Sequence, residues 1–281
     1  CSDRLPKIAR MVSQIAKFLT QKKIDVVIVV GDVDSSLAGA LAASKLKLPL
    51  VHIEAGLRSQ DLKTPEELNR FIVDQLSNLH FITEPSAKKN LLAEGFERST
   101  IKYVGNLMIE SLITHQNKIH TSQILKKLKL TPKTYLVATI HRHENITSKA
   151  SLTKILKLLQ RLSKSYPLVF PLHPHTANQI KLFGLDKYLS PILTTNPLGY
   201  FEFLKLVSES LGVITDSGGI QEETTFLGIP CCTLRDHTER PITIELGTNK
   251  LFPLETTPQM IERHLRHQRK PAPIRYWDDQ V

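Results

Sequence analysis

The segment TDSGGIQEETTFLGIP, residues 215–230, places two glycines directly ahead of a glutamine and two glutamates. A β-branched apolar run ends near Thr215 and helix-forming residues follow, which predicts a strand-to-helix turn made of Ser217, Gly218 and Gly219. The free amides and the dipole of a helix N-terminus suit phosphate oxygens. A nearby carboxylate can accept hydrogen bonds from ribose hydroxyls, so the segment predicts a nucleotide site. The alternative is a tight turn whose glutamates, Glu222 and Glu223, only complement the helix dipole.

Carboxylates also follow earlier apolar runs. Asp32 comes after VVIVVG and Glu54 after PLVHI, while Glu66 opens a predicted helix, where ordinary capping explains it equally well. Asp34 or Ser35 can cap another helix, which leaves Asp32 without that explanation. Several carboxylates at one site would allow proton transfer if burial raised the pKa of one of them toward neutrality.

Basic side chains cluster after later strands. TIHRHENI contains His141 and Arg142, and PLHPHT contains His173. Neither histidine pair has further ligands at a recognised metal-site spacing, so we expect phosphate contacts or core histidines, and no metal. The loop LRDHTERP adds Arg240, whose guanidinium can hold a pyrophosphate at two points. The alternative there is a surface ion pair between Glu239 and a neighbouring arginine.

The composition narrows the function classes. The chain has 281 residues and a net charge of +10, but its lysines are scattered over helical segments, which indicates a solvated basic surface and not a nucleic-acid site. No apolar run approaches the roughly 18 residues of a membrane span. No secretory signal is recognised, and Cys231 and Cys232 lie in an apolar setting typical of core thiols in a reducing compartment, so a cytoplasmic location is expected. Because the chain starts at Cys1, we interpret it as a fragment or a trimmed chain.

The elements that must position these groups alternate between apolar β-branched runs and helical segments, which is typical of α/β folds with parallel sheets. The alternation pauses over residues 107–132, a polar stretch predicted to be a helical linker. We therefore predict two doubly wound Rossmann-like domains facing across a cleft, residues 1–110 and 111–281. Ligands of such sheets bind beyond the carboxyl ends of the strands, where the polar groups named above fall. A serine elbow, a Walker loop and the Gly-x-Gly-x-x-Gly fingerprint are absent from the sequence.

The order and spacing of several motifs closely resemble the non-hydrolysing UDP-N-acetylglucosamine 2-epimerase family: GDVDSSLA, HIEAGLRSQDLKTPEELNR, VGN, HRHEN, PLHP, PLGYFEF, TDSGGIQEE, LGIPC and RDHTERPITIELGTN. The resemblance covers about residues 10–277. It implies a glycosyltransferase-B-like architecture and interconversion of UDP-N-acetylglucosamine and UDP-N-acetylmannosamine. In the expected chemistry, the C2 proton is lost with expulsion of UDP to give 2-acetamidoglucal. UDP then returns and the opposite face is protonated, with no cofactor.

The resemblance also implies roles for individual positions. The family's catalytic positions match Asp32, Glu54, Glu66 and His141. The UDP-binding positions match Phe203 at the uracil, Ser217, Gly218 and Gly219 at the pyrophosphate, Glu223 at the ribose and Arg240 at the phosphates, which His141 would also contact. The positions at which bacterial members bind a second UDP-N-acetylglucosamine as activator match Arg10, Arg142 and His173. A homodimer is expected.

Three departures from the family pattern leave alternatives open. The family begins with a strand and a Gly-Thr-Arg-Pro-Glu turn that would precede Cys1, and it continues into a closing helix, so this chain by itself is expected to bind poorly or to be inactive. Leu198 replaces a glutamine often found near the uracil. The loop before Glu66 resembles a branch that acts on a modified sugar such as a diacetamido uronic acid. The alternatives are that diacetamido-sugar epimerase, a hydrolysing epimerase, a glycosyltransferase on the same architecture, and a truncated UDP-binding fragment.

Overall fold

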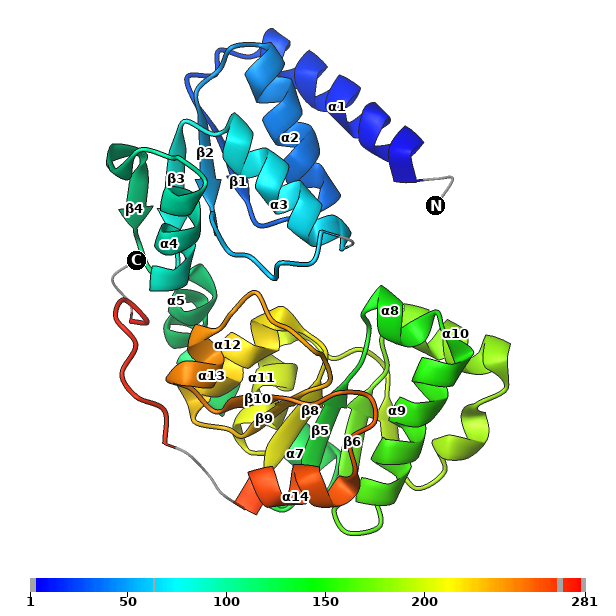
Figure 1. Ribbon diagram of the computed structural model, residues 1–281. Coiled ribbons are helices and arrows are strands. Elements are labelled where there is room, and N and C mark those ends of the chain that lie inside the picture. Colours follow the sequence, from blue (N-terminus) through cyan, green and yellow to red (C-terminus); the bar gives the residue numbers. More distant parts are fainter. Residues whose placement is uncertain (1–3, 63, 267–269, 279–281) are drawn as a thin grey trace. The chain divides into compact units, whose positions relative to one another are not determined.

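The computed structural model describes residues 4–62, 64–266 and 270–278 (Figure 1). The chain divides into two compact units, the first ending at Asn106 and the second beginning at Leu107. Each unit contains one sheet, and paired strands run parallel to each other in both. None of the helices in the described ranges has the length and apolar content that crossing a bilayer requires.

The first unit is built on a four-stranded sheet in the order β1-β2-β3-β4. Its strands are β1 (Val27–Val30), β2 (Leu50–Ile53), β3 (Leu79–Ile82) and β4 (Ile101–Tyr103). Its helices are α1 (Arg4–Gln21), α2 (Asp34–Lys45), α3 (Pro65–Leu76), α4 (Pro85–Ala93) and the 3-10 turn η1 (Arg98–Thr100). Consecutive strands are neighbours, which confirms the βαβ succession that the sequence predicts. β1 is an edge strand and leaves Ile28 and Val30 exposed.

The start of α2 differs from the expectation. Its N-cap is Val33, without a side-chain cap, and not Asp34 or Ser35. The Asp34 carboxylate instead accepts hydrogen bonds from the Arg4 guanidinium, with Nε to Oδ2 at 2.9 Å, and from Asn69 Nδ2 at 3.1 Å. These contacts to α1 and α3 leave the carboxylate no role in capping its own helix.

The second unit contains a six-stranded sheet in the order β10-β9-β8-β5-β6-β7. Its strands are β5 (Leu136–Thr139), β6 (Leu168–Pro171), β7 (Leu193–Thr195), β8 (Gly212–Thr215), β9 (Cys231–Thr233) and β10 (Asn249–Leu251). Its helices are α5 (Leu107–Thr114), α6 (Gln116–His120), α7 (Ile124–Lys127), α8 (His143–Ile146), α9 (Lys149–Leu162), α10 (Pro174–Phe183), α11 (Tyr200–Ser208), α12 (Gly218–Leu227), α13 (Ile242–Glu245) and α14 (Pro258–Arg266), with the 3-10 turn η2 (Asp186–Tyr188).

The strand order of this sheet reverses between β5 and β8. The chain runs outward from β5 through β6 to β7, and then returns to the other side of β5 to form β8, β9 and β10. Ligands of open parallel sheets bind beyond the carboxyl ends of the strands at such a reversal. The topology therefore indicates a ligand site among the residues that follow Thr139 and Thr215.

The stretch predicted as a linker is helical, but it is part of the second unit. Helix α5 packs on α12, whereas α6 and α7 both pack on α11. Met108 of α5 limits the space beside α12, because a Cβ at Gly219 would lie 2.7 Å from its Cε atom. Helices α5 to α7 therefore support the helices beside β8, whereas the sequence suggested only a connection.

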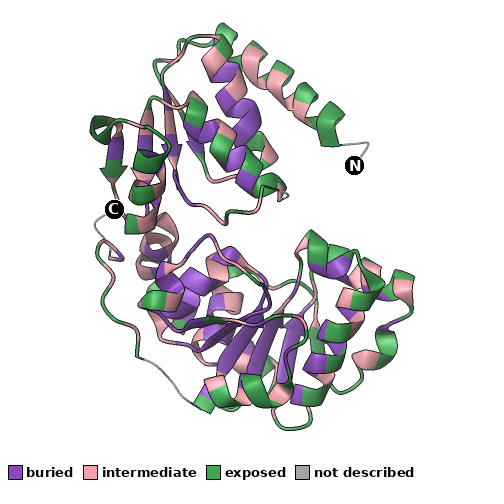
Figure 2. Ribbon diagram, in the orientation of Figure 1, coloured by how far each residue is buried: buried purple, intermediate pink, exposed green. Residues whose placement is uncertain are grey.

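The core of the second unit follows its central strands, which are buried along their length in Figure 2. Leu136 and Ile214 pack with the apolar face of α9 on one side of the sheet, while Val137 and Val213 pack with α11 on the other. Cys231 of β9 is also fully buried, and burial raises the pKa of its thiol to about 11. The prediction of an inert core thiol is consistent with this setting.

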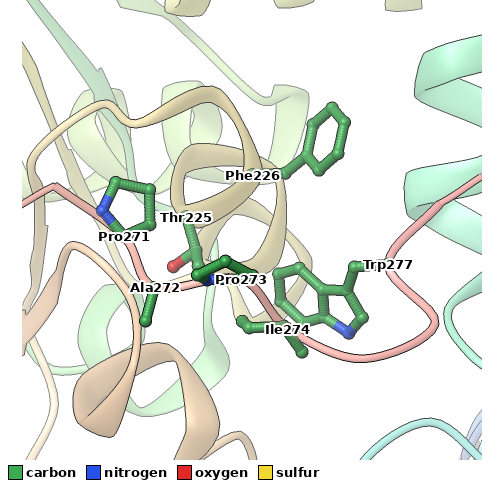
Figure 3. Close-up of a pocket in the computed structure, with 7 residues that line it drawn as sticks. All are labelled: Thr225, Phe226, Pro271, Ala272, Pro273, Ile274 and Trp277. Carbon is green, nitrogen blue, oxygen red and sulfur yellow. The ribbon is translucent and has the colours of Figure 1, made fainter.

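The last described segment, residues 270–278, lies along α12. Ala272 N donates to Leu246 O at 2.8 Å, and Trp277 packs into an apolar cluster with Ile109 and Ile242. Figure 3 shows the pocket of about 280 Å³ that this segment forms, lined by Thr225, Phe226, Pro271, Ala272, Pro273, Ile274 and Trp277. None of the predicted site residues lines it.

Candidate active site

The predicted anion-binding turn lies at the carboxyl end of β8, but its boundaries differ. Ser217 is the N-cap of α12, and the helix begins at Gly218, so both glycines are helical. Glu222 and Glu223 consequently lie beyond the first turn, which contains no acidic residue. The alternative in which they only complement the helix dipole is therefore wrong, because the free amides belong to the first turn.

Asp216 connects the loops that follow β5 and β8. Its fully buried carboxylate accepts hydrogen bonds from the backbone N–H groups of His141 at 3.1 Å and Arg142 at 3.0 Å, and from Asn145 Nδ2 at 3.0 Å. These three donors give Asp216 a structural role. Their effect is to hold His141, whose side chain is 41% exposed, next to the start of α12.

Three arginines surround the carboxylate of Glu239. Arg240 Nη1 lies 2.7 Å from Glu239 Oε1, Arg235 Nη2 lies 2.8 Å from Oε2, and Arg142 Nη2 lies 3.4 Å from Oε1. Arg240 Nε also donates to Glu222 Oε2 at 2.6 Å. The expected ion pair is present, but it is buried and not on the surface, since Glu239 is 6% exposed.

The charges in this cluster balance one another. Burial alone would raise the pKa of Glu239, but Arg240, Arg235 and Arg142 together hold it well below its usual range, so the carboxylate is ionised. Glu222 is the second negative group. Glu144, 3.6 Å from Arg142, is the third, so the three guanidinium groups are balanced by carboxylates. The start of α12 favours an anion because the free amides of its first turn lie beside the Arg240 guanidinium.

Gly218 allows the cluster to approach the helix. A Cβ at this position would collide with Glu239 Oε1 and lie 2.9 Å from Arg240 Nη1. Only glycine lets the guanidinium lie directly against the first turn of α12. The close approach brings Arg240 and the amides of that turn to one location, as the predicted pyrophosphate site requires.

Two acids of the first unit share one arginine. Arg70 Nη2 lies 2.5 Å from Asp32 Oδ2 and 4.0 Å from Glu54 Oε2. The guanidinium is 2% exposed, whereas the carboxylates of Asp32 and Glu54 are 23% and 19% exposed. A buried cation between two accessible carboxylates holds both of them at one location.

Sequence reasoning missed Arg70. Helix α3 buries Glu67, Arg70, Val73 and Asp74, a spacing of three and four residues that marks its inner face. An arginine on that face needs a buried acidic partner. That periodicity was the signal that could have identified it.

Glu66 and Glu67 of α3 differ in exposure. Glu66 is exposed in the first turn, while Glu67 is buried and accepts backbone N–H groups of Ser59 and Gln60, both at 2.8 Å. Glu67 thus shapes the loop that precedes the helix. Glu66 is the one of the pair that faces solvent and is open to a ligand.

The remaining candidates lie in different elements. Arg10 is exposed on α1, and His173 is exposed at the start of α10, with its ring centroid 6.0 Å from that of His141. Arg142 is half-buried near Glu239. Phe203 of α11 is partly buried against the second core cluster. Among the described residues, no group of three or more His, Cys, Asp or Glu side chains is arranged to hold a metal ion.

Comparison with known proteins places this chain in a family. The model of the UDP-N-acetylglucosamine 2-epimerase family matches residues 3–278. The chain belongs to this family. The UDP-N-acetylglucosamine 2-epimerase of Methanocaldococcus jannaschii is 40% identical over 86% of this chain and 68% of its own length. The UDP-2,3-diacetamido-2,3-dideoxy-D-glucuronate 2-epimerase of Pseudomonas aeruginosa is 41% identical over 86% of this chain and 67% of its own length.

Solved structures of the family share the fold. The Methanocaldococcus jannaschii enzyme in complex with UDP-GlcNAc and UDP superposes with a TM-score of 0.90 at 35% identity, covering 97% of this chain and 77% of that one. The Neisseria meningitidis enzyme bound to UDP-GlcNAc gives a TM-score of 0.83 at 32% identity, covering 92% and 72%. The predicted family and the glycosyltransferase-B-like α/β fold with two parallel sheets are thereby confirmed, in a chain shorter than these epimerases.

Glu223 differs from the other acids of the candidate site. It is 4% exposed on α12, and burial together with the charge of Glu222 raises its pKa to about 7, although a hydrogen bond with the Tyr200 hydroxyl lowers it in part. Near neutral pH, this carboxyl therefore titrates. A carboxyl group with a raised pKa loses its proton when a polar ligand donates hydrogen bonds to it and so replaces the water lost on burial.

We expect Glu223→Gln to stabilise the protein in a pH-dependent way. Between the usual pKa of 4.5 and the folded value of about 7, the folded state binds the extra proton, so stability falls as the pH rises through this window. The substitution should raise the free energy of unfolding by up to about 3 kcal/mol at pH 8 and have little effect at pH 4. Urea denaturation at both pH values measures this, with the exposed Glu245→Gln as control. An equal effect at both pH values would contradict the assignment.

Proposed function

We propose that this epimerase interconverts UDP-N-acetylglucosamine and UDP-N-acetylmannosamine without releasing free sugar. The observation that carries the proposal is the start of α12, where Gly218 lets the Arg240 guanidinium lie beside the free amides of the first helical turn. Glu223 lies one turn further along the same helix. The complexes of the Methanocaldococcus jannaschii and Neisseria meningitidis enzymes with UDP-GlcNAc support the choice of ligand.

The second unit would bind the nucleotide. The amides of Ser217, Gly218 and Gly219 and the side chains of Arg240 and His141 would contact the diphosphate, Glu223 would accept hydrogen bonds from the ribose, and Phe203 would pack near the uracil. UDP gains negative charge as its bond to the sugar breaks. Preorganised N–H donors and cations at that point lower the barrier, because they stabilise charge that develops in the transition state.

The first unit would carry out the proton transfers, with Asp32, Glu54 and Glu66 as the acid and base positions. One carboxylate removes the proton from C2, the C1–O bond breaks, and its electron pair leaves with UDP, so that a C1=C2 double bond forms in 2-acetamidoglucal. In the return step, UDP attacks C1 and an acid protonates C2 from the opposite face. Atoms and electrons balance without a redox cofactor, since the product is an isomer of the substrate.

A second candidate substrate is UDP-2,3-diacetamido-2,3-dideoxy-D-glucuronate. The Pseudomonas aeruginosa epimerase named for that sugar is 41% identical to this chain, as close as the UDP-N-acetylglucosamine 2-epimerases. Both substrates share UDP and a 2-acetamido group, so the chemistry above applies to either. The difference lies at C3 and C6 of the sugar ring.

The deciding experiment is incubation of the protein in deuterated water with each UDP-sugar separately. Deuterium at C2 together with the epimeric UDP-sugar supports the proposal, and the substrate with the higher kcat/KM is the native one. A glycosyltransferase would leave C2 unlabelled, and a hydrolysing epimerase would release free N-acetylmannosamine. UDP binding in calorimetry without exchange would identify a binding fragment instead.

We further propose that the protein is a homodimer and that Arg10, Arg142 and His173 bind a second UDP-N-acetylglucosamine as activator. Light scattering tests the first statement. Equilibrium dialysis tests the second, since two molecules of UDP-sugar per chain are expected, and one molecule would overturn it.

A further inference from the structure

The first unit contains a buried histidine that the chemistry above does not use. His52 lies on β2, two residues before Glu54, and is fully buried. Its register partners are Val29 on β1 and His80 on β3, so β2 has a neighbouring strand on each side. Both ring nitrogens have partners. Nδ1 lies 2.6 Å from Asp74 Oδ1, and Nε2 lies 3.0 Å from Gly31 O.

Asp74 of α3 completes a small charged cluster. Its carboxylate is fully buried, and its second oxygen accepts the backbone N–H of Gly56 at 3.1 Å and faces Arg58 Nη2 at 2.7 Å. Arg58 also donates to the partly exposed Glu94, with Nε to Oε1 at 2.8 Å. Burial alone would raise the pKa of Asp74, but His52 and Arg58 lower it, so the carboxylate is ionised.

These partners define the protonation of His52. A carbonyl oxygen can only accept a hydrogen bond, and so can an ionised carboxylate, so both ring nitrogens must donate. His52 lies in one cluster with Arg58, Asp74 and Glu94, whose mutual contacts compensate for the burial of the Asp74 carboxylate.

The two backbone groups tied to this pair flank the candidate acids. Gly31 O is one residue ahead of Asp32, and Gly56 N is two residues after Glu54. The backbone is left-handed at Gly31 (φ 65°), Glu54 (φ 66°) and Gly56 (φ 75°). A glutamate in this region is strained, and such strain persists only where surrounding contacts maintain it. Those contacts here include His52 and Asp74.

We propose that the buried His52–Asp74 ion pair is a positioning device, which holds the turn before Asp32 and the turn after Glu54 as one unit so that both acids keep their orientation. This inference rests on the proposed function, because the two acids must then act on the same sugar ring. Neither His52 nor Asp74 would touch the substrate. Their contribution is geometric, and displacement of a reacting group by about 1 Å can cost on the order of 100-fold in rate.

The test compares His52→Gln with a matched control, His80→Gln. His80 is equally buried on the adjacent strand, and its Nε2 contacts only the backbone oxygen of Asp74, at 2.9 Å. We expect His52→Gln to lower kcat and C2 deuterium exchange by about 30- to 100-fold, with KM and UDP affinity within twofold. His80→Gln should stay within about threefold of the wild type. Circular dichroism verifies that each variant is folded.

Two further measurements test the inference independently of the His52→Gln variant. Nitrogen-15 NMR of the wild-type histidine rings should show a hydrogen on both nitrogens of His52 at pH 7, and one bare nitrogen would overturn the inference whether or not the protein is active. Asp74→Asn should reproduce the loss of kcat if His52→Gln does not fold. Equal exchange rates in both histidine variants would also overturn the inference, whereas absence of exchange in the wild type would reject the proposed function.

Discussion

Glu54→Gln is expected to reduce C2 deuterium exchange by on the order of 1000-fold while leaving UDP affinity within twofold. The amide has nearly the same shape and keeps the left-handed backbone that residue 54 requires, but it cannot accept or deliver a proton. UDP affinity should persist, because the proposed nucleotide contacts all come from the second unit. Exchange is followed by NMR in deuterated water, and affinity by calorimetry.

The control for this substitution is Glu97→Gln, which changes an exposed glutamate whose contact is with Ser99. It should leave both measurements unchanged. If Glu54→Gln lowered exchange and UDP affinity together, the role of Glu54 would be structural. If exchange stayed near the wild-type rate, Glu54 would be excluded as acid or base, and Asp32 or Glu66 would have to supply that step.

Gly218→Ala should weaken UDP binding by about 100-fold. The new methyl group would collide with Glu239 and press on Arg240 Nη1, 2.9 Å from the Cβ position. Since both partners are nearly buried and tied to each other, they cannot move aside without breaking the arginine cluster. Loss of about 3 kcal/mol of binding energy follows from one displaced charge-assisted contact and its disturbed neighbours.

The matched control is Gly39→Ala in α2 of the first unit, where the nearest atom to a new Cβ is Val29 Cγ1 at 3.2 Å and no charged group lies close. It should leave UDP affinity within twofold, as measured by calorimetry. Unchanged affinity in Gly218→Ala would mean that the diphosphate does not bind at the start of α12. The proposed nucleotide site would then have to be abandoned.

The elements that carry the site were predictable because their signals are local. Buried parallel strands appear as short β-branched runs, and the polar residue that ends each run marks the edge where ligands bind. Asp32, Glu54 and Ser217 were found in this way. The family was recognised because many such local motifs occur in one order, and the fold follows from that membership.

The contacts among these residues were not predictable to the same degree. Asp216 holds the loop of His141, which is 75 residues away in the sequence, and no local pattern indicated this contact. Arg70 lies 38 residues from Asp32 and was not singled out. The alternative for Glu239 was a surface ion pair, but its carboxylate lies among the three arginines Arg142, Arg235 and Arg240 and is nearly buried.

The sequence by itself therefore determined the family, the α/β alternation and the strand-end acids, because periodicity and turn chemistry depend on neighbouring residues. Only the tertiary structure decided which charged groups pair with each other and which can still contact a ligand. That distinction depends on strand order, since β8 lies beside β5 across a long crossover. It also depends on burial, because the fully buried Asp216 carboxylate is occupied by donors of the protein itself.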